Sequence, residues 1–170
     1  MSIHLVIGPM FAGKSSELIR KLRRYRAANK SVAVLKPVLD TRCSTDIVET
    51  HDNTTIPARS VSSLCDYVPD ADVIGVDEGQ FFPDLARTCE LWASQGKIVI
   101  VAALDGTYQR KPFLVVSELI PLCEEVVRLT AVCHSCGEDA AFSRRLGDSD
   151  DPILIGGADL YVASCRKCLK

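Results

Sequence analysis

Residues Gly8 to Ser15 read G-P-M-F-A-G-K-S, which matches the phosphate-binding loop pattern G-x-x-x-x-G-K-[ST] in full. An apolar run, Ile3–Ile7, comes directly before the loop, and a helix-like stretch begins at Ser15. A strand that leads into such a loop, with a helix behind it, aims backbone N–H groups and the positive end of the helix at phosphate. The pattern therefore predicts an α/β protein that binds a nucleotide.

Two side chains of this loop have predicted roles of their own. Lys14 is expected to reach the outer phosphates, and the Ser15 hydroxyl to ligate a magnesium ion. The loop residues predicted to bind ATP are Gly8, Pro9, Met10, Phe11, Ala12, Gly13, Lys14 and Ser15.

Composition narrows the class of protein. A chain of 170 residues fits one domain, with room for a small appendage, and 47% hydrophobic residues suffice for a core. A net charge of −2 argues against a nucleic-acid binder. Five basic residues follow the loop, and we interpret them as a solvated helix face, with a subunit contact or phosphate steering as alternatives. They are Arg20, Lys21, Arg23, Arg24 and Arg26.

The sequence carries no predicted targeting segment or membrane span, because Gly8 and Pro9 interrupt the N-terminal apolar run. A cytoplasmic location is therefore expected. In such a reducing compartment the eight cysteines are not expected to form disulfides, so their spacing indicates metal ligands or core residues.

Short apolar runs alternate with helical stretches, as in a parallel sheet covered on both faces. We expect a P-loop (RecA-like) α/β fold in residues 1–132 and a small zinc-binding lobe in residues 133–170. The stretch 37–59 lacks clear periodicity and is predicted to be a long connection. The expected strands are Ile3–Ile7, Val32–Lys36, Asp72–Asp77, Lys97–Leu104 and Val126–Val132. The expected helices are Ser15–Asn29, Pro83–Gln95 and Val115–Cys123.

Two carboxylates, Asp77 and Glu78, end the third expected strand. In a P-loop protein an aspartate at this position holds the nucleotide's magnesium ion, usually through water. Glu78 could take a proton from an attacking hydroxyl, because the chain leaves the pleat here and both side chains can face one cleft. The alternative is that both are exposed loop acids.

Three aromatic residues follow strand ends. In open α/β sheets, ligands bind beyond the carboxyl ends of the strands, so Phe81, Tyr108 and Phe113 could line a flat pocket for a ring, although aromatic residues are often core. Arg42 and Arg110 are candidates for stabilising phosphate charge, with surface ion pairs as the alternative.

Two cysteine pairs, Cys133-x-x-Cys136 and Cys165-x-x-Cys168, stand 28 residues apart (137–164). Each pair can chelate one tetrahedral Zn²⁺ from a tight turn, and four thiolates leave no open position for chemistry. We therefore predict a structural zinc site with an insertion between its halves, and a disulfide or redox pair is the alternative.

These residues, and several longer strings, resemble the cytosolic-type (type II) thymidine kinases, and the likeness runs along almost the whole chain. The resemblance depends on short sequence segments that the P-loop fold itself does not require. They are Asp40-Thr41-Arg42, Asp77-Glu78-Gly79-Gln80-Phe81-Phe82, Ala103-Leu104-Asp105-Gly106-Thr107, Gln109-Arg110-Lys111-Pro112-Phe113, Leu129-Thr130-Ala131-Val132-Cys133 and Ile155-Gly156-Gly157-Ala158-Asp159.

The resemblance implies transfer of the γ-phosphate of ATP to the 5′-hydroxyl of thymidine, giving dTMP for DNA synthesis, with Glu78 as the base and Asp77 near magnesium. It also implies a lasso-like loop, about Gly147 to Asp159, that closes over thymine. The further residues it assigns to ATP are Asp40, Thr41, Arg42, Gly79 and Gln80. Those it assigns to thymidine are Met10, Phe81, Leu104, Tyr108, Phe113, Pro152, Ile153, Leu154, Ile155, Gly156 and Tyr161.

Members of this family are usually tetramers inhibited by dTTP, and the resemblance extends both expectations to this chain. The sequence departs from the family pattern in two places. Tyr108 stands where phenylalanine is common, which raises the question of another deoxynucleoside as substrate. The chain also stops two residues after Cys168, without the long tail of the animal enzymes.

Overall fold

A computed structural model of the chain describes residues 1–40, 47–50, 53–147 and 156–169. Its centre is a six-stranded sheet in the order β5-β2-β6-β7-β1-β8, and every neighbouring pair is parallel. The strands are β1 (Ser2–Gly8), β2 (Val32–Pro37), β5 (Arg59–Val61), β6 (Val73–Val76), β7 (Ile98–Leu104) and β8 (Glu125–Arg128).

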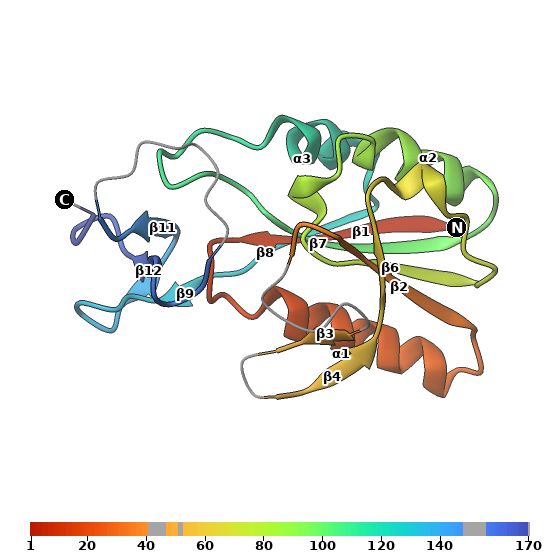
Figure 1. Ribbon diagram of the computed structural model, residues 1–170, viewed down its shortest axis with the longest axis horizontal. Coiled ribbons are helices and arrows are strands. Elements are labelled where there is room, and N and C mark those ends of the chain that lie inside the picture. The colour runs from red at the N-terminus through yellow and green to blue at the C-terminus, as the bar shows by residue number, and fades with distance from the viewer. Residues whose placement is uncertain (41–46, 51–52, 148–155, 170) are drawn as a thin grey trace.

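Helices cover both faces of this sheet, as Figure 1 shows. One face packs on Leu18, Ile19 and Leu22 of α1 (Lys14–Ala27), and the other on the buried residues of α2 (Leu85–Ser94) and α3 (Leu114–Leu119). Doubly covered strands bury both faces, which explains their continuous apolar runs. The predicted α/β fold, with a parallel sheet flanked by helices, is confirmed.

The helices and strands of this part of the chain are connected by short 3₁₀ turns, and two of the helices are followed by residues with positive φ angles. The predicted third helix is one α-helix followed by a 3₁₀ turn, because Pro121 cannot donate a backbone hydrogen bond. Asn29 and Gly96 follow their helices with positive φ angles of 59° and 90°, as predicted for helix stops. The 3₁₀ turns are η1 (Leu64–Asp66), η2 (Gly79–Phe81) and η3 (Ile120–Leu122).

The stretch 37–59 holds more structure than the sequence predicts. An antiparallel hairpin joins β3 (Ile47–Glu49) to β4 (Thr55–Pro57), and β5 begins directly after it. The hairpin packs because Val48 and Ile56 are buried against the α1 side of the sheet. Three-residue strands are too short to give a periodic pattern.

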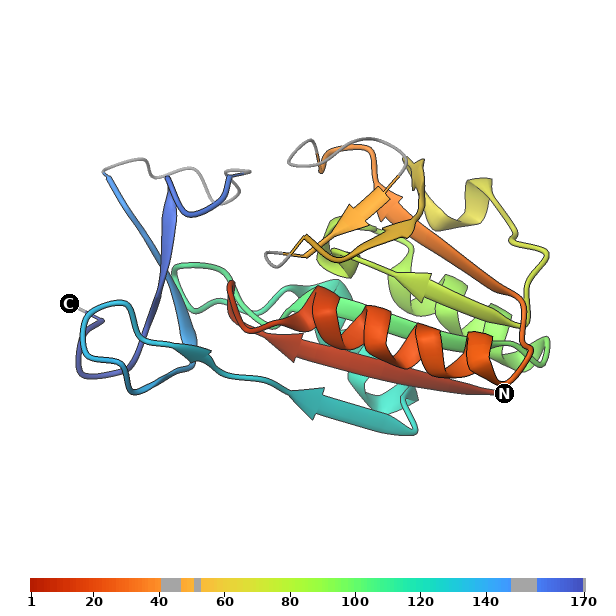
Figure 2. The same ribbon diagram turned by 90° about the horizontal axis from the view of Figure 1, so that it is seen from below.

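From Ala131 the chain leaves the large sheet. It forms two antiparallel pairs, β9 (Ala131–Val132) with β10 (Asp139–Ala140) and β11 (Phe142–Arg145) with β12 (Tyr161–Ser164). Seen from below in Figure 2, these small sheets lie beyond the carboxyl ends of the long strands. The predicted strand Val126–Val132 divides in two because β1 ends at Gly8 and offers no further backbone partner.

The predicted division of the chain near residue 132 coincides with this change of sheet, and it remains a proposal. In the residues that the structure describes, no helix is both long enough and apolar enough to cross a membrane.

Candidate functional site

The phosphate loop joins β1 to α1, in the strand–loop–helix context that the sequence predicts. Two of its glycines are required by geometry. A Cβ on Gly8 would lie 2.5 Å from the carbonyl oxygen of Leu129, and Gly13 has a φ angle of 77° at the start of the helix. The loop backbone can therefore bend closely enough to surround a phosphate group.

The two functional side chains of the loop lie on its inner side. The Lys14 ammonium donates a hydrogen bond of 2.7 Å to the carbonyl of Pro9. The Ser15 hydroxyl donates to both carboxylate oxygens of Asp77, at 2.9 and 3.2 Å. Residues 62 positions apart are thus brought together.

The carboxylates that follow β6 both line a cavity next to the phosphate loop. Asp77 is 5% exposed, and its N–H donates to the carbonyl of Leu35. Glu78 has a φ angle of 51°, so the chain turns sharply after the strand. This turn lets neighbouring side chains face the same space, as the sequence predicts, instead of opposite faces of the sheet.

Gln80 connects Glu78 to the next strand. Its amide nitrogen donates to Glu78 Oε2 at 2.5 Å, and its amide oxygen accepts a hydrogen bond of 3.0 Å from the N–H of Leu104. The side chain is 6% exposed. Gln80 was predicted to bind ATP, whereas the geometry gives it a second task, which is to orient the Glu78 carboxylate.

The cavity has a volume of about 440 Å³. Asp40 is 7% exposed and lines it, whereas Gly79 is buried and is not among the lining residues. Every described residue that was predicted to bind thymidine lines this one cavity: Met10, Phe81, Leu104, Tyr108, Phe113, Gly156 and Tyr161. The predictions for Thr41, Arg42, Pro152, Ile153, Leu154 and Ile155 lie outside the described residues.

Sequence reasoning missed several residues at this cavity. Lys36 is 1% exposed, lines the cavity and donates to the carbonyl of Ile47, where the hairpin begins. A lysine inside an apolar strand run is the signal that could have found it, because lysine is almost never fully buried unless paired. The hairpin also contributes Glu49, Thr50 and Asn53 to the lining.

The C-terminal strands contribute two more residues that were missed. Ser143 on β11 lines the cavity, and its hydroxyl accepts a hydrogen bond of 2.9 Å from the N–H of Met10 in the phosphate loop. Arg145, two residues later, lies with its guanidinium over the ring of Tyr108. The small sheets are therefore part of the wall of the site.

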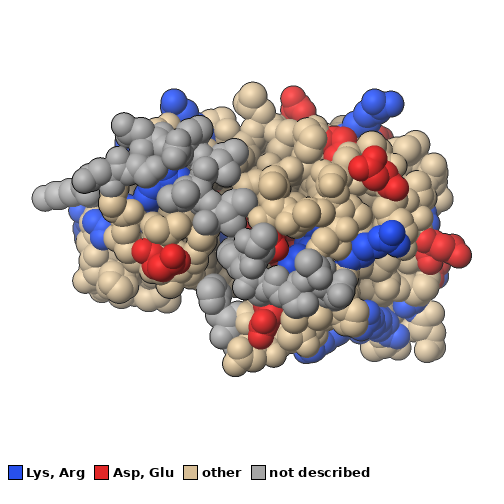
Figure 3. All heavy atoms as spheres, in the orientation of Figure 1, with Lys and Arg blue, Asp and Glu red and all other residues tan. Residues whose placement is uncertain are grey.

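The predicted basic cluster has the solvated character that we favoured. Arg20, Arg23, Arg24 and Arg26 are exposed on α1, and blue spheres gather along the lower edge in Figure 3, where this helix lies. Arg20 pairs with Glu17 one turn earlier, and Lys21 with Glu125 at the edge of the sheet.

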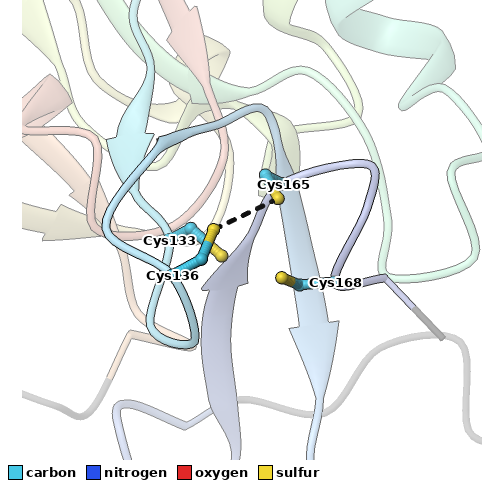
Figure 4. Close-up of side chains that lie close together, drawn as sticks. All are labelled: Cys133, Cys136, Cys165 and Cys168. Atoms are coloured by element: carbon cyan, nitrogen blue, oxygen red, sulfur yellow. Dashed lines mark hydrogen bonds between the residues drawn. The ribbon is translucent and has the colours of Figure 1, made fainter.

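The four predicted zinc ligands meet at one point in space. The sulfurs of Cys133, Cys136, Cys165 and Cys168 all lie within 4.8 Å of one another. Figure 4 shows the four side chains converging from two turns, with the sulfurs of Cys136 and Cys165 3.6 Å apart. Sulfurs around a tetrahedral zinc ion at about 2.3 Å are separated by about 3.8 Å, so the cluster has the size of a zinc site.

The ionisation of these thiols also fits a cation. A backbone hydrogen bond from Cys165 helps lower the pKa of Cys133 to about 6. Hydrogen bonds with the Cys136 and Cys165 thiols raise the pKa of Cys168 to about 12. Cys133 thus forms a thiolate easily, whereas Cys168 resists ionisation. Four thiolates this close together would repel one another. A divalent cation would remove that conflict.

The remaining cysteines differ in environment. Cys65 is exposed, Cys89 is buried and Cys123 is half-buried, as expected for surface and core thiols, and Cys43 lies outside the described residues. Burial raises the pKa of the Cys89 thiol well above its usual range, and that of Cys123 to about 11.

Comparison with known proteins gives one consistent result. A family model described as thymidine kinase matches residues 1–169. The thymidine kinase of Raccoon poxvirus is 54% identical over 169 residues, which is 98% of this chain and 95% of that protein. Those of Vaccinia virus (strain Western Reserve) and Monkeypox virus are 53% identical over the same shares of each chain.

Proposed function

The chain belongs to the thymidine kinase family, and from this premise we propose how its residues carry out the phosphorylation of thymidine. The proposed reaction transfers the γ-phosphate of ATP to the 5′-hydroxyl of thymidine, giving dTMP and ADP. One observation supports this assignment of the site most strongly. Residues of the phosphate loop, two carboxylates and the predicted thymidine-binding residues line the same cavity.

The phosphates of ATP would lie in the loop from Gly8 to Ser15, with the Lys14 ammonium at the outer phosphates. Ser15 and Asp77 would hold Mg²⁺, and their oxygen donors suit this hard cation. When bound, this ion neutralises charge on the transferred phosphoryl group. Asp40, Gly79 and Gln80 complete the proposed ATP-binding residues, together with Thr41 and Arg42, which lie outside the described residues.

Glu78 is the proposed general base. Its carboxylate would take the proton of the 5′-hydroxyl as that oxygen bonds to the γ-phosphorus and the bond to the ADP oxygen breaks. Gln80 supports this role because it holds the carboxylate from one side and is itself fixed to the end of β7. A positioned acid or base typically contributes about 10²–10⁴-fold in rate.

The nucleoside would occupy the apolar end of the cavity. Phe81 and Phe113 offer flat apolar surface, and Tyr161 of β12 is 7% exposed there. The hydroxyl of Tyr108 accepts a hydrogen bond of 3.0 Å from Gln109, an exposed residue. This partner supports a thymidine pocket in which the Tyr108 ring replaces the common phenylalanine without adding a polar group for another base. We retain residues 152–155 as proposed contacts to thymine.

Zinc would be held by Cys133, Cys136, Cys165 and Cys168. When bound, it supplies the crosslink that fixes the small C-terminal sheets, and four thiolate ligands leave no position for a substrate. Zinc would therefore affect the reaction only indirectly, by positioning the residues of these sheets that line the cavity.

Two parts of the proposal, a homotetramer and feedback inhibition by dTTP, rest on the family resemblance alone. We also propose a cytoplasmic location, as the sequence predicts, and a division into residues 1–132 and 133–170 at the point where the cysteine pairs begin.

The first experiment is ATP-dependent conversion of thymidine to dTMP with Mg²⁺, beside deoxyuridine, deoxycytidine and a control without nucleoside. We expect selective phosphorylation of thymidine. Equal turnover of deoxycytidine would contradict the assigned pocket. ATP hydrolysis without transfer to any nucleoside would contradict the proposed reaction while leaving the phosphate loop assigned.

A further inference from the structure

Arg145 is a buried cation that nothing in the proposed reaction uses. It lies on β11, directly opposite Tyr161 in the β11–β12 register, and is 8% exposed. Its Nη2 and Nε atoms donate to the Tyr161 hydroxyl at 2.6 and 3.2 Å. Arginine is almost never so buried unless it is paired, and the Tyr161 hydroxyl is one partner that holds this side chain in place.

The same guanidinium contacts a second tyrosine from a distant part of the chain. Its central carbon lies 3.9 Å from the ring centroid of Tyr108 and 5.2 Å from that of Tyr161. Tyr108 follows β7 of the large sheet, whereas Tyr161 begins β12 of the small one. The guanidinium of Arg145 therefore connects a residue that follows the large sheet with a residue of the small sheet.

Both tyrosines line the cavity, and Arg145 is not among the lining residues. It lies behind them. A cation over an aromatic ring is attracted by the ring's negative face, more strongly when both are desolvated. A planar guanidinium can stack on one ring while its fixed fork of N–H groups binds the other side chain. A compact ammonium has no flat face to stack and no fork of fixed geometry.

We propose that Arg145 is a positioning residue for thymidine, which fixes the rings of Tyr108 and Tyr161 relative to each other at the nucleoside end of the cavity. This inference rests on the proposed function, because it takes these two tyrosines as part of the thymidine pocket. Because Arg145 contacts the two tyrosines at the nucleoside end, ATP binding at the phosphate end should depend on it far less.

The test is steady-state kinetics of the full-length, zinc-loaded protein with Arg145→Met. We expect the KM for thymidine to rise about tenfold, the equivalent of about 1.4 kcal/mol, while the KM for ATP changes less than about twofold. Arg145→Lys keeps the charge but not the planar fork, and should show a smaller rise. Arg144→Met is the matched control on the opposite face of the same strand, and it should leave both constants unchanged.

Loss of folded protein cannot imitate this result. A partly unfolded sample has a lower apparent kcat, whereas the KM values of its folded fraction are unchanged. Should Arg145→Met fail to fold, Arg145→Lys and Arg145→Gln provide the same comparison of the two KM values. Equal rises in both KM values would overturn the inference, because they would indicate a general structural role.

Tyr108→Ala separates failure of this inference from failure of the proposed pocket. If Tyr108→Ala raises the KM for thymidine and Arg145→Met does not, the positioning role is wrong and the pocket stands. If Tyr108→Ala, too, leaves this KM unchanged, the pocket assignment and the inference both fall. Under the proposal, Arg145→Met adds less in the Tyr108→Ala background than in the parent enzyme.

Discussion

The hydroxyl of Ser15, in the first turn of α1, is hydrogen-bonded to the carboxylate of Asp77, directly after β6. The helix that carries the phosphate loop and the strand that carries the acidic pair are therefore held together at the two residues proposed to bind magnesium. Five predictions test this site and its surroundings.

Asp77→Asn should weaken the dependence on magnesium. The neutral amide keeps the size of the side chain but removes the charge that attracts the cation. We expect kcat at moderate Mg²⁺ to fall about 10²-fold, as for loss of one preorganised electrostatic contact, and to recover partly at high Mg²⁺. Titration of turnover with Mg²⁺ measures this. Glu118→Gln, an exposed acid on α3, is the control, and an unchanged Asp77→Asn titration would exclude the residue from the metal site.

Glu78→Gln should retain ATP and thymidine binding but lose transfer, because an amide cannot accept the hydroxyl proton. We expect kcat to fall at least about 10²-fold, with small changes in both KM values. Gln80→Ala removes the orienting hydrogen bond but keeps the base, so its kcat should fall less. Undiminished turnover by Glu78→Gln would remove this residue from the mechanism.

Zinc removal should affect the ATP site as well as the thymidine site. Phe11 and Ala12 of the phosphate loop pack against the buried cluster that contains Cys133 and Cys165, and the Met10 N–H bonds to Ser143. We expect Cys165→Ser to lose zinc and to raise the KM for both substrates. Metal analysis and kinetics measure the two effects, with Cys65→Ser as the exposed control. Full zinc content, or an unchanged KM for ATP, would argue against this coupling.

Tyr108→Phe should leave catalysis almost unchanged. The phenylalanine ring keeps its face toward Arg145. Within the part of the chain that the structure describes, the lost hydroxyl bonds only to Gln109, which is exposed. We expect the KM for thymidine to change less than about twofold, and preference over deoxycytidine to persist. A large change in this preference would show that the hydroxyl takes part in base selection.

Alkylation of Cys123 should depend steeply on pH. Burial raises the pKa of this thiol to about 11, so at pH 8 about one molecule in a thousand carries the reactive thiolate. Its labelling by iodoacetamide should rise about tenfold per pH unit between pH 7 and 9, as read by mass spectrometry. A rate that levels off near pH 9 would mean that the thiol has an ordinary pKa.

The sequence predicted those features that depend on local pattern. The phosphate loop, the buried strands and the cysteine spacing each arise from neighbouring residues, and all three appear where expected. The resemblance to a family added the thymidine residues, whose described members share one cavity.

Features that depend on tertiary partners were not predicted. The hairpin of β3 and β4 forms because two isolated apolar residues, Val48 and Ile56, meet α1. From the sequence, Arg145 is one of two consecutive arginines that would be expected at the surface. Its burial follows from the pairing of β11 with β12, which places it opposite Tyr161. Neither event leaves a periodic signal in the chain.

Phe11 and Glu78 have φ angles of 65° and 51° and line the cavity. In the turn that follows α1, away from the cavity, the same backbone region is occupied by Asn29, and asparagine tolerates it well. A larger side chain in this region costs about 1–3 kcal/mol. Selection for a stable fold alone would therefore favour glycine or asparagine at both cavity positions. In a lineage that no longer needed the reaction, Phe11 and Glu78 would be among the first residues to drift away.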